Sequence, residues 1–167
     1  MRDFDRAARH LELARDMNPN DAQILIGWAW AQGCLGNPER GLPGAELAMR
    51  LNPRYPRYYE LFLSRILFLL RRYEEAAAIL KRLTAGSPLD HPRDVAWRAA
   101  ALGHLGRTEE ARRCGEYFLE AIPRRWRGDP AAGRAEYVDW LVDGSYLRRT
   151  EDEACLREGL RLAGLPV

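Results

Sequence analysis

The sequence has little of several features that would point to a particular class of protein. Its three cysteines, Cys34, Cys114 and Cys155, are far apart, and Lys81 is the only lysine among 26 basic residues. Without a C-x-x-C spacing the cysteines predict neither a zinc site nor a disulfide framework, so we expect reduced thiols, no metal and a cytoplasmic protein. The 26 basic and 24 acidic residues leave a net charge of only +2, which argues against a nucleic-acid-binding protein.

Long apolar runs and catalytic motifs are also missing. The most apolar stretch, 61–70, contains Arg65 and is half as long as the roughly 20 residues of a transmembrane helix. The first residues are charged and amphipathic, unlike a secretion signal. No P-loop, G-x-S-x-G, H-E-x-x-H or G-x-G-x-x-G pattern occurs, and the acidic pairs at 74–75 and 109–110 fit the first turn of a helix. We therefore expect no enzyme, no cofactor and no membrane contact.

The sequence does contain a repeat with a fixed period. One marker recurs every 35 residues, as LGNPERG at 35–41, LRRYEEA at 70–76 and LGRTEEA at 105–111. A second marker recurs every 34 or 35 residues, namely Pro19, Pro53, Pro88 and Pro123. Two independent markers with one period indicate an array of repeated structural units.

Both halves of each unit have the periodicity of a helix. Before the closing proline, apolar and small residues recur at steps of three and four, for example Tyr73, Ala76, Leu80 and Leu83. The other half has a similar stripe and ends at Leu-Gly, where Gly36 and Gly106 suit the left-handed residue that follows a helix. Each unit is therefore predicted to be a pair of helices joined by a tight turn.

On this register of helix pairs and prolines, the chain resembles the tetratricopeptide repeat family from about Phe4 to Pro123. The resemblance implies an all-α solenoid of helix–turn–helix units, wound as a right-handed superhelix. We assign a half repeat to 1–20, repeats to about 21–54, 55–89 and 90–124, and a linker with two C-terminal capping helices to 124–167. In that last segment Asp129–Pro130 predicts one helix start, and Thr150 with Glu153 predicts a capping box at the other.

The second helix of unit 21–54 departs from the pattern. Gly41 stands where the other units have alanine, and Pro43 follows inside the expected helix. Because proline removes a helical hydrogen bond, either the helix starts at Pro38 and kinks, or it starts late, near Pro43.

The resemblance further implies a ligand groove lined by the first helix of each unit. Its register contains Gln23, Ile26, Trp30, Cys34, Tyr58, Leu61, Arg65, Phe68, Arg93, Ala96 and His104. Arg65 is the lone charge of its apolar helix and needs a partner, either an internal carboxylate or an anionic ligand such as a peptide carboxylate. The groove lacks the lysines and asparagines with which some chaperone-binding arrays clamp two carboxylates, so that function is disfavoured.

A narrower resemblance concerns the setting of the array. LRRYEEA at 70–76, HLGRTEEA at 104–111 and GLRLAGLP at 159–166 are similar to the C-terminal repeat region of bacterial class III adenylate/guanylate cyclases. The resemblance implies the non-catalytic, regulatory end of a longer signalling protein. We therefore expect a scaffold that binds a protein or peptide.

Two alternatives belong to other classes. The half repeat 1–20 lacks its partner helix, so Phe4 and Leu11 are expected to meet upstream residues or a second chain. In the latter case the module would self-assemble into a homo-oligomer. The other alternative is a small-molecule sensor with a pocket between Trp30, Tyr58 and Phe68.

Overall fold

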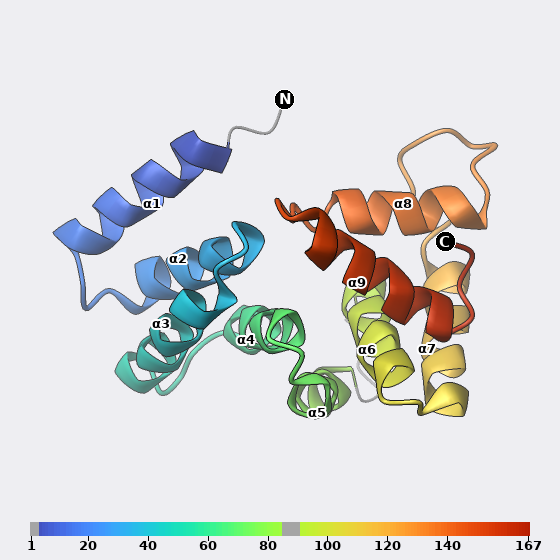
Figure 1. Ribbon diagram of the computed structural model, residues 1–167, viewed down its shortest axis with the longest axis horizontal. Helices are drawn as coiled ribbons and strands as arrows, with labels where there is room; N and C mark the ends of the chain where they lie inside the picture. The colour runs from blue at the N-terminus through green and yellow to red at the C-terminus, as the bar shows by residue number, and fades with distance from the viewer. Residues whose placement is uncertain (1–3, 85–90) are drawn as a thin grey trace.

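The computed structural model describes residues 4–84 and 91–167, and every regular element in those ranges is a helix (Figure 1). The helices are α1 (Phe4–Met17), α2 (Ala22–Cys34), α3 (Pro38–Leu51), α4 (Tyr58–Leu69), α5 (Tyr73–Leu83), α6 (Pro92–His104), α7 (Thr108–Ala121), α8 (Arg134–Asp143) and α9 (Thr150–Leu162). Pro88 and the repeat boundary expected near residue 89 lie outside the described residues. None of these helices is long and apolar enough to cross a membrane.

Three consecutive helix pairs, α2–α3, α4–α5 and α6–α7, form the body of the molecule. The same turn joins the helices of each pair, with N–H donors of Asn37, Arg72 and Arg107 bonded to the carbonyls of Gln32, Leu67 and Leu102 at 2.8, 2.9 and 3.0 Å. This bond is the mark of a helix end that passes through one left-handed residue. The predicted residues Gly36 and Gly106 adopt that conformation, with φ of 87° and 69°.

The middle turn departs from the other two because Arg71 takes the glycine position with φ 63°. A left-handed residue with a side chain costs about 1–2 kcal/mol. The side chain of Arg71 reaches α9, where its Nη2 lies 3.2 Å from Asp152 Oδ1, and Asp152 is buried. The turn therefore keeps its place in the repeat, and the ion pair with Asp152 accounts for an arginine at a position where the other units have glycine.

The irregular helix α3 starts at Pro38 and continues through Pro43 without a break, so the late start is wrong. Pro43 and Glu39, whose carbonyl loses its helical donor, are both exposed and can bond to water. Gly41 is explained by close packing, because a Cβ there would lie 2.5 Å from the carbonyl oxygen of Ala29. The alanine of the other units does not fit at this crossing of α2 and α3.

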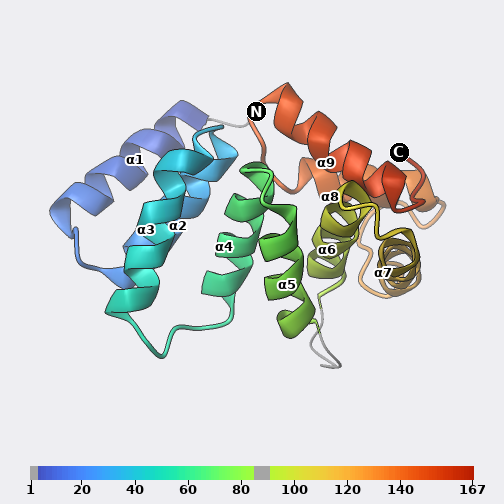
Figure 2. The same ribbon diagram turned by 60° about the horizontal axis from the view of Figure 1, so that its bottom comes forward.

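The C-terminal helices lie on the α6–α7 end of the array, as expected for caps. Helix α9 packs against α6, and Leu156 and Leu160 are fully buried there. The helices approach closely because both carry glycine at the crossing: a Cβ on Gly159 would lie 2.7 Å from the carbonyl oxygen of Ala100. In Figure 2, α1 and α9 lie on the same side of the row formed by α3, α4, α5 and α6.

Two details of the C-terminal segment differ from expectation. Asp129 and Pro130 form a turn in which Asp129 Oδ1 accepts from the N–H of Ala131 at 2.8 Å, and α8 begins only at Arg134. Helix α9 does begin at Thr150, but Arg149 precedes it as the cap and no side chain caps its N–H groups. Local sequence signals thus placed the helices correctly and their first residues less well, since a polar residue before proline suits a turn equally well.

Candidate functional site

An apolar cavity with a volume of about 410 Å³ lies between α1 and α2. It is lined by Phe4, Ala7, Ala8, Leu11, Gly27, Trp30, Ala31, Cys34, Leu35 and Tyr146. We call it the α1–α2 pocket. Helix α1 forms one wall, α2 forms the floor, and Tyr146 comes from the connection between α8 and α9. None of the ten lining residues carries a charge, so the pocket suits an apolar occupant.

The pocket is open because α1 packs mainly on one helix, α2, and none of its residues is buried. Glu12 links the polar edge of α1 to α2 and α3. Its carboxylate accepts a hydrogen bond from Gln32 Nε2 at 3.0 Å and pairs with Arg40 Nη2 at 3.3 Å. On the floor, a Cβ added to Gly27 would meet no atom within 4 Å. The helix is therefore attached along one edge, and its apolar face is left uncovered.

The far side of the pocket is formed by a segment more than a hundred residues away in sequence. The N–H of Arg148 donates to the carbonyl of Cys34 at 2.8 Å, and Cys34 Sγ lies 3.8 Å from the carbonyl oxygen of Ser145. Arg148 also pairs with Asp5 of α1, Nη1 to Oδ1, at 2.8 Å. The α8–α9 connection thus contacts both α2 and α1 and completes the frame of the pocket.

Two predictions from the sequence meet in this pocket. Phe4 and Leu11, expected at a self-association surface, and Trp30 and Cys34, expected in the ligand groove, line one cavity. Burial raises the pKa of the Cys34 thiol to about 12, so it is a neutral wall of the pocket and not a nucleophile. The sequence pattern gave no sign of Tyr146, because nothing local ties it to α2.

Beside the pocket, the first helices of two units present aromatic side chains. Trp30 stacks on Phe62 with ring centroids 5.7 Å apart, and Tyr58 meets Phe62 edge to face at the same distance. Phe62 was absent from the predicted groove, although it is one residue from Leu61. These rings are half-buried, and they continue the apolar surface from α2 to α4.

Arg65 has an internal partner. Its Nη2 lies 2.8 Å from Asp94 Oδ1, and the exposed fractions of the two side chains are 17% and 5%. The guanidinium also lies 5.7 Å from the centre of the Trp30 ring and 5.6 Å from that of Trp97. Of the two predicted roles, this geometry supports the ion pair, because the carboxylate that Arg65 needs is supplied by α6.

Several other predicted groove residues are not accessible. Phe68 is fully buried, and Ile26 is 1% exposed, so neither can line an open groove. The predicted sensor pocket between Trp30, Tyr58 and Phe68 is therefore wrong. Ala96 is buried as well, and Leu61 packs against the core. Only Gln23 is fully exposed; it lies near Tyr58 in a shallow hollow at the N-terminal ends of α2 and α4.

The C-terminal helices cover the predicted groove at the third helix pair, α6–α7. Arg93 stacks its guanidinium 4.0 Å from the centre of the Trp140 ring of α8, and burial lowers its pKa. His104 bonds through Nε2 to the carbonyl of Cys155 on α9 at 2.9 Å. The chain therefore covers its own groove at this end, which the repeat pattern could not predict.

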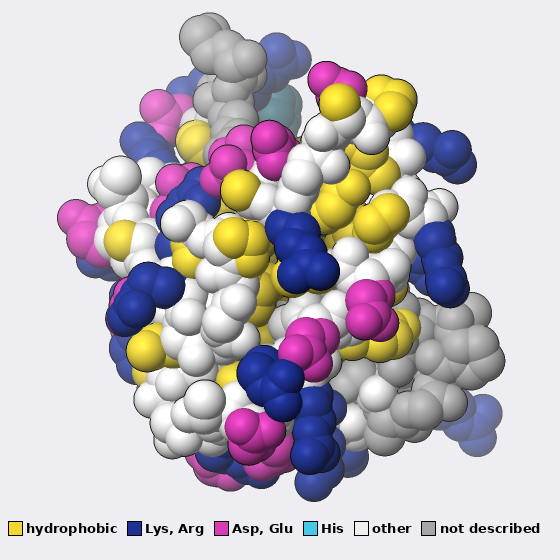
Figure 3. All heavy atoms as spheres, turned by 90° about the vertical axis from the view of Figure 1, so that its right-hand side faces the viewer, with side chains coloured by type: hydrophobic (Ala, Val, Ile, Leu, Met, Phe, Trp, Pro, Cys, Tyr) yellow, Lys and Arg dark blue, Asp and Glu magenta, His cyan; other side chains and the backbone are white. Residues whose placement is uncertain are grey.

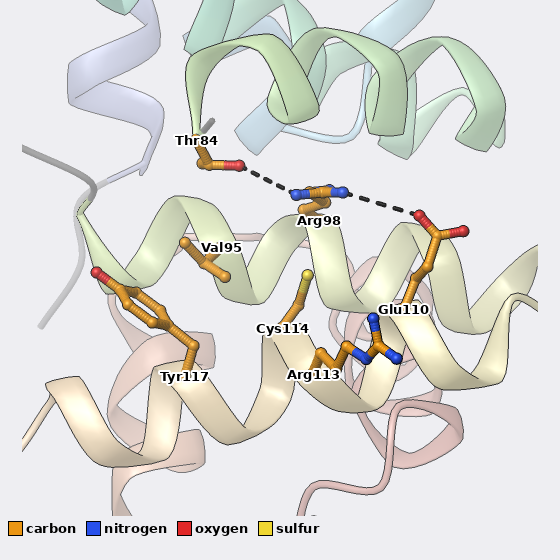
Figure 4. Close-up of a pocket in the computed structure, with 7 residues that line it drawn as sticks. All are labelled: Thr84, Val95, Arg98, Glu110, Arg113, Cys114 and Tyr117. Atoms are coloured by element: carbon orange, nitrogen blue, oxygen red, sulfur yellow. Dashed lines mark hydrogen bonds and ion pairs between the residues drawn. The ribbon is translucent and has the colours of Figure 1, made fainter. Parts of the chain in front are cut away.

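A second cavity, of about 440 Å³, lies between α6 and α7 and was not predicted (Figure 4). In it Arg98 points between Thr84 and Glu110, at 3.4 Å from Thr84 Oγ1 and 3.9 Å from Glu110 Oε2. Cys114 lies at the cavity wall, and burial raises its pKa. Charged side chains line this cavity, whereas the α1–α2 pocket has none, so the α1–α2 pocket is the better candidate for binding an apolar group.

Among residues 4–84 and 91–167, no three His, Cys, Asp or Glu side chains are placed to hold a metal ion. The acidic pairs lie in the first turns of α5 and α7, where Glu75 and Glu110 pair with Arg72 and Arg107 at 2.6 and 2.7 Å. On the face formed by the C-terminal end, basic and acidic side chains are interspersed (Figure 3).

The chain is similar to solved structures of MamA. The crystal structure of MamA superimposes with a TM-score of 0.59 at 15% identity, covering 97% of this chain and 90% of that one. The MamA RS-1 ArsTM double mutant gives 0.62 at 16% identity, covering 95% and 84%. A further crystal structure of the MamA protein gives 0.58 at 16% identity, with 97% and 84% covered. The fold is thus an all-helical solenoid of the tetratricopeptide type.

No family model matches the chain, and no curated protein matches it in sequence. At the identities above, the likeness to MamA concerns the fold, and the function has to be argued from the site.

Proposed function

We infer that this chain is a non-catalytic protein-interaction module that receives an apolar side chain, or the apolar face of a short helix, in the α1–α2 pocket. The observation that carries the proposal is the lining of the pocket, ten uncharged residues contributed by α1, which has no buried residue, and by the segments that face it. A cavity of about 410 Å³ accommodates one or two large side chains. Burying such a side chain stabilises a complex by about 1.5–3 kcal/mol, which is typical of an interface anchor.

The same lining favours a protein over a metabolite. Small-molecule sites combine apolar walls with a few convergent polar groups that fix the orientation of the ligand. In this pocket the polar atoms are the hydroxyl of Tyr146, the indole nitrogen of Trp30 and the neutral thiol of Cys34. An apolar side chain needs no such groups, because the rest of its own chain supplies the specificity.

Gly27 offers a direct test, because it lines the pocket and a Cβ added there meets no atom within 4 Å, so a leucine can be introduced to occupy the pocket. Short random peptides displayed on phage are selected on the wild-type protein, and those enriched should carry Leu, Phe or Trp. Gly27→Leu should weaken the selected peptides at least about tenfold. Ala154→Leu, on the exposed face of α9, adds the same side chain elsewhere and should leave binding unchanged. Peptides without apolar anchors, or binding that survives Gly27→Leu, would contradict the proposal.

Self-assembly is the second candidate, and the exposed side of α1 favours it. Leu13 and Met17 are 58% and 71% exposed, on a helix with no buried residue. Light scattering over a range of concentrations should give a dimer for the wild type and a monomer for Leu13→Arg. A monomer at every concentration would rule this candidate out and leave the pocket proposal intact.

For the setting we propose the regulatory part of a bacterial cytoplasmic signalling protein such as a nucleotide cyclase. The support is the resemblance of 70–76, 104–111 and 159–166 to the repeat region of class III cyclases. The complete reading frame of the gene tests it. A class III catalytic domain upstream is expected, and a frame without one would remove this part of the proposal.

A further inference from the structure

We propose that Cys155 is a nucleophilic thiol, and so a modification site for small hydroperoxides and other soft electrophiles. It lies on α9 at the point where this helix meets α5 and α6, in a cluster with Tyr73 and His104. The Tyr73 hydroxyl lies 3.2 Å from Cys155 Sγ, and His104 Nε2 lies 3.5 Å from it. Neither the repeat architecture nor the α1–α2 pocket requires this arrangement.

The geometry makes the sulfur an acceptor on two sides. His104 Nε2 is 2.9 Å from the carbonyl oxygen of Cys155, and because a carbonyl only accepts, the proton of the ring must be on Nε2. The same N–H faces the sulfur, and Tyr73 can donate its hydroxyl to it from the other side. Tyr73 and His104 are held together by stacking, with ring centroids 4.4 Å apart. The Tyr73 hydroxyl, together with the His104 N–H that is shared between the carbonyl and the sulfur, favours the thiolate over the thiol.

The charges around the cluster act in the same direction. Arg71 reaches α9 from its left-handed turn and places a positive charge near the sulfur. The carboxylates of α9 nearest the cluster are paired, Asp152 with Arg71 at 3.2 Å and Glu158 with Arg161 at 2.7 Å. Burial opposes ionisation of Cys155, but the hydrogen bonds from His104 and Tyr73 and the charge of Arg71 outweigh it and lower the pKa of the thiol.

The other two cysteines provide internal controls. Cys34 and Cys114 are buried, and burial raises the pKa of each. Cys155 is partly exposed, so a small reagent can reach it. One protein therefore contains an activated thiol and two inert ones, and their reactivities can be compared in a single sample.

The reaction with hydrogen peroxide is a two-electron transfer. The thiolate of Cys155 attacks one peroxide oxygen, an S–O bond forms and the O–O bond breaks. The second oxygen leaves as hydroxide with the electron pair and takes a proton from solvent, giving water. The product is the sulfenic acid, which the reagent dimedone traps as a stable thioether.

Alkylation by iodoacetamide, followed for each cysteine by peptide mass spectrometry across pH, tests the proposal on the whole chain. Near neutral pH, Cys155 should react at least about tenfold faster than Cys34 and Cys114, with a midpoint below the value of about 8.5 for a free thiol. Peroxide followed by dimedone should label Cys155 alone. Tyr73→Phe keeps the ring and removes the donor, so it should raise the midpoint.

Tyr117→Phe, at an exposed tyrosine of α7, is the matched control and should change nothing. His104→Gln keeps a donor without the imidazole and should slow the reaction as well, with circular dichroism used to confirm that each variant is folded. The proposal is overturned if Cys155 has a midpoint at or above about 8.5, if it reacts no faster than it does in urea, or if Tyr73→Phe leaves its midpoint unchanged.

Discussion

The helices compared at the two ends of the array, α1 and α6, differ in how far other parts of the chain cover them. At the C-terminal end α6 is covered by α5, α7 and α9, and ten of its thirteen residues are buried. At the N-terminal end α1 has α2 as its main neighbour and none of its residues is buried. The two helices are of similar length, but α6 is the more apolar of the two. The chain covers α6 with its own C-terminal helix and leaves α1 largely uncovered.

This contrast suggests where the molecule is available to a partner. Helical repeats bury their apolar faces against neighbours, and a unit without a neighbour leaves its face open. Here α8 and α9 occupy the groove at the third unit, while their connection only frames the pocket at the first. The predicted groove is thus shortened to its N-terminal part. The following variants compare the two ends directly.

The largest difference is expected between two leucine truncations. Leu160 of α9 is fully buried against α6, so Leu160→Ala should lower the free energy of unfolding by about 2–5 kcal/mol. Leu11 of α1 lines the open pocket, and Leu11→Ala should cost less than about 1 kcal/mol because little packing is lost. Urea denaturation measures both. Equal losses would mean that α1 is packed as tightly as α9.

The ion pair between α4 and α6 comes next. Asp94→Ala leaves the guanidinium of Arg65 largely buried with no carboxylate, and should cost about 1.5–3 kcal/mol. The matched control is Glu158→Ala, which removes an exposed carboxylate from a pair at 2.7 Å and should leave the stability close to that of the wild type. Comparable losses from the two variants would show that Arg65 gains little from its partner.

Alanine substitutions at two helical glycines should change the stability by smaller amounts, with opposite signs at the two positions. Gly159→Ala puts a Cβ 2.7 Å from the carbonyl oxygen of Ala100, and the strain of about 1–3 kcal/mol should exceed the gain in helix propensity. Gly27→Ala meets nothing within 4 Å and should stabilise the protein by up to about 1 kcal/mol. Thermal unfolding should therefore shift down for the first and up for the second. Two shifts of the same sign would contradict this account.

The smallest effect concerns the exposed pair between Asp5 and Arg148. Arg148→Ala should change the global stability by less than about 1 kcal/mol, and less still at high salt. Its local consequence is easier to see, because α1 loses a link to the α8–α9 connection. Hydrogen exchange of the α1 amides should become faster while that of α6 does not. Unchanged exchange in α1 would show that the pair does not hold this helix.

Much of the fold could be predicted because it depends on local chemistry with a fixed period. Gly36 and Gly106 marked helix ends, and Ala76 and Ala111 marked the close approach within a pair. Gly41 was an apparent departure whose reason lies in the carbonyl of Ala29, a contact between two helices that no local pattern contains. Helix starts at Asp129 and Thr150 were less predictable, since the same polar residues serve turns.

The candidate site was predicted only in part. Phe4 and Leu11 were expected at an uncovered face because the half repeat lacks its partner helix, and Trp30 was assigned to the groove by the repeat register. Tyr146 and the cluster around Cys155 were not, because they join residues that are far apart along the chain. Phe68 was placed in the groove although it is buried, since the repeat register says which face a residue is on and not what later covers it.

The sequence by itself determined the helices, their pairing and the period of the array. Those properties follow from backbone sterics and from apolar side chains spaced along one chain segment. The tertiary structure decided which part of the groove stays open. The N–H of Arg148 bonds to the carbonyl of Cys34, and Arg71 pairs with Asp152. Such long-range contacts have no period, so only the folded chain shows where a partner can enter.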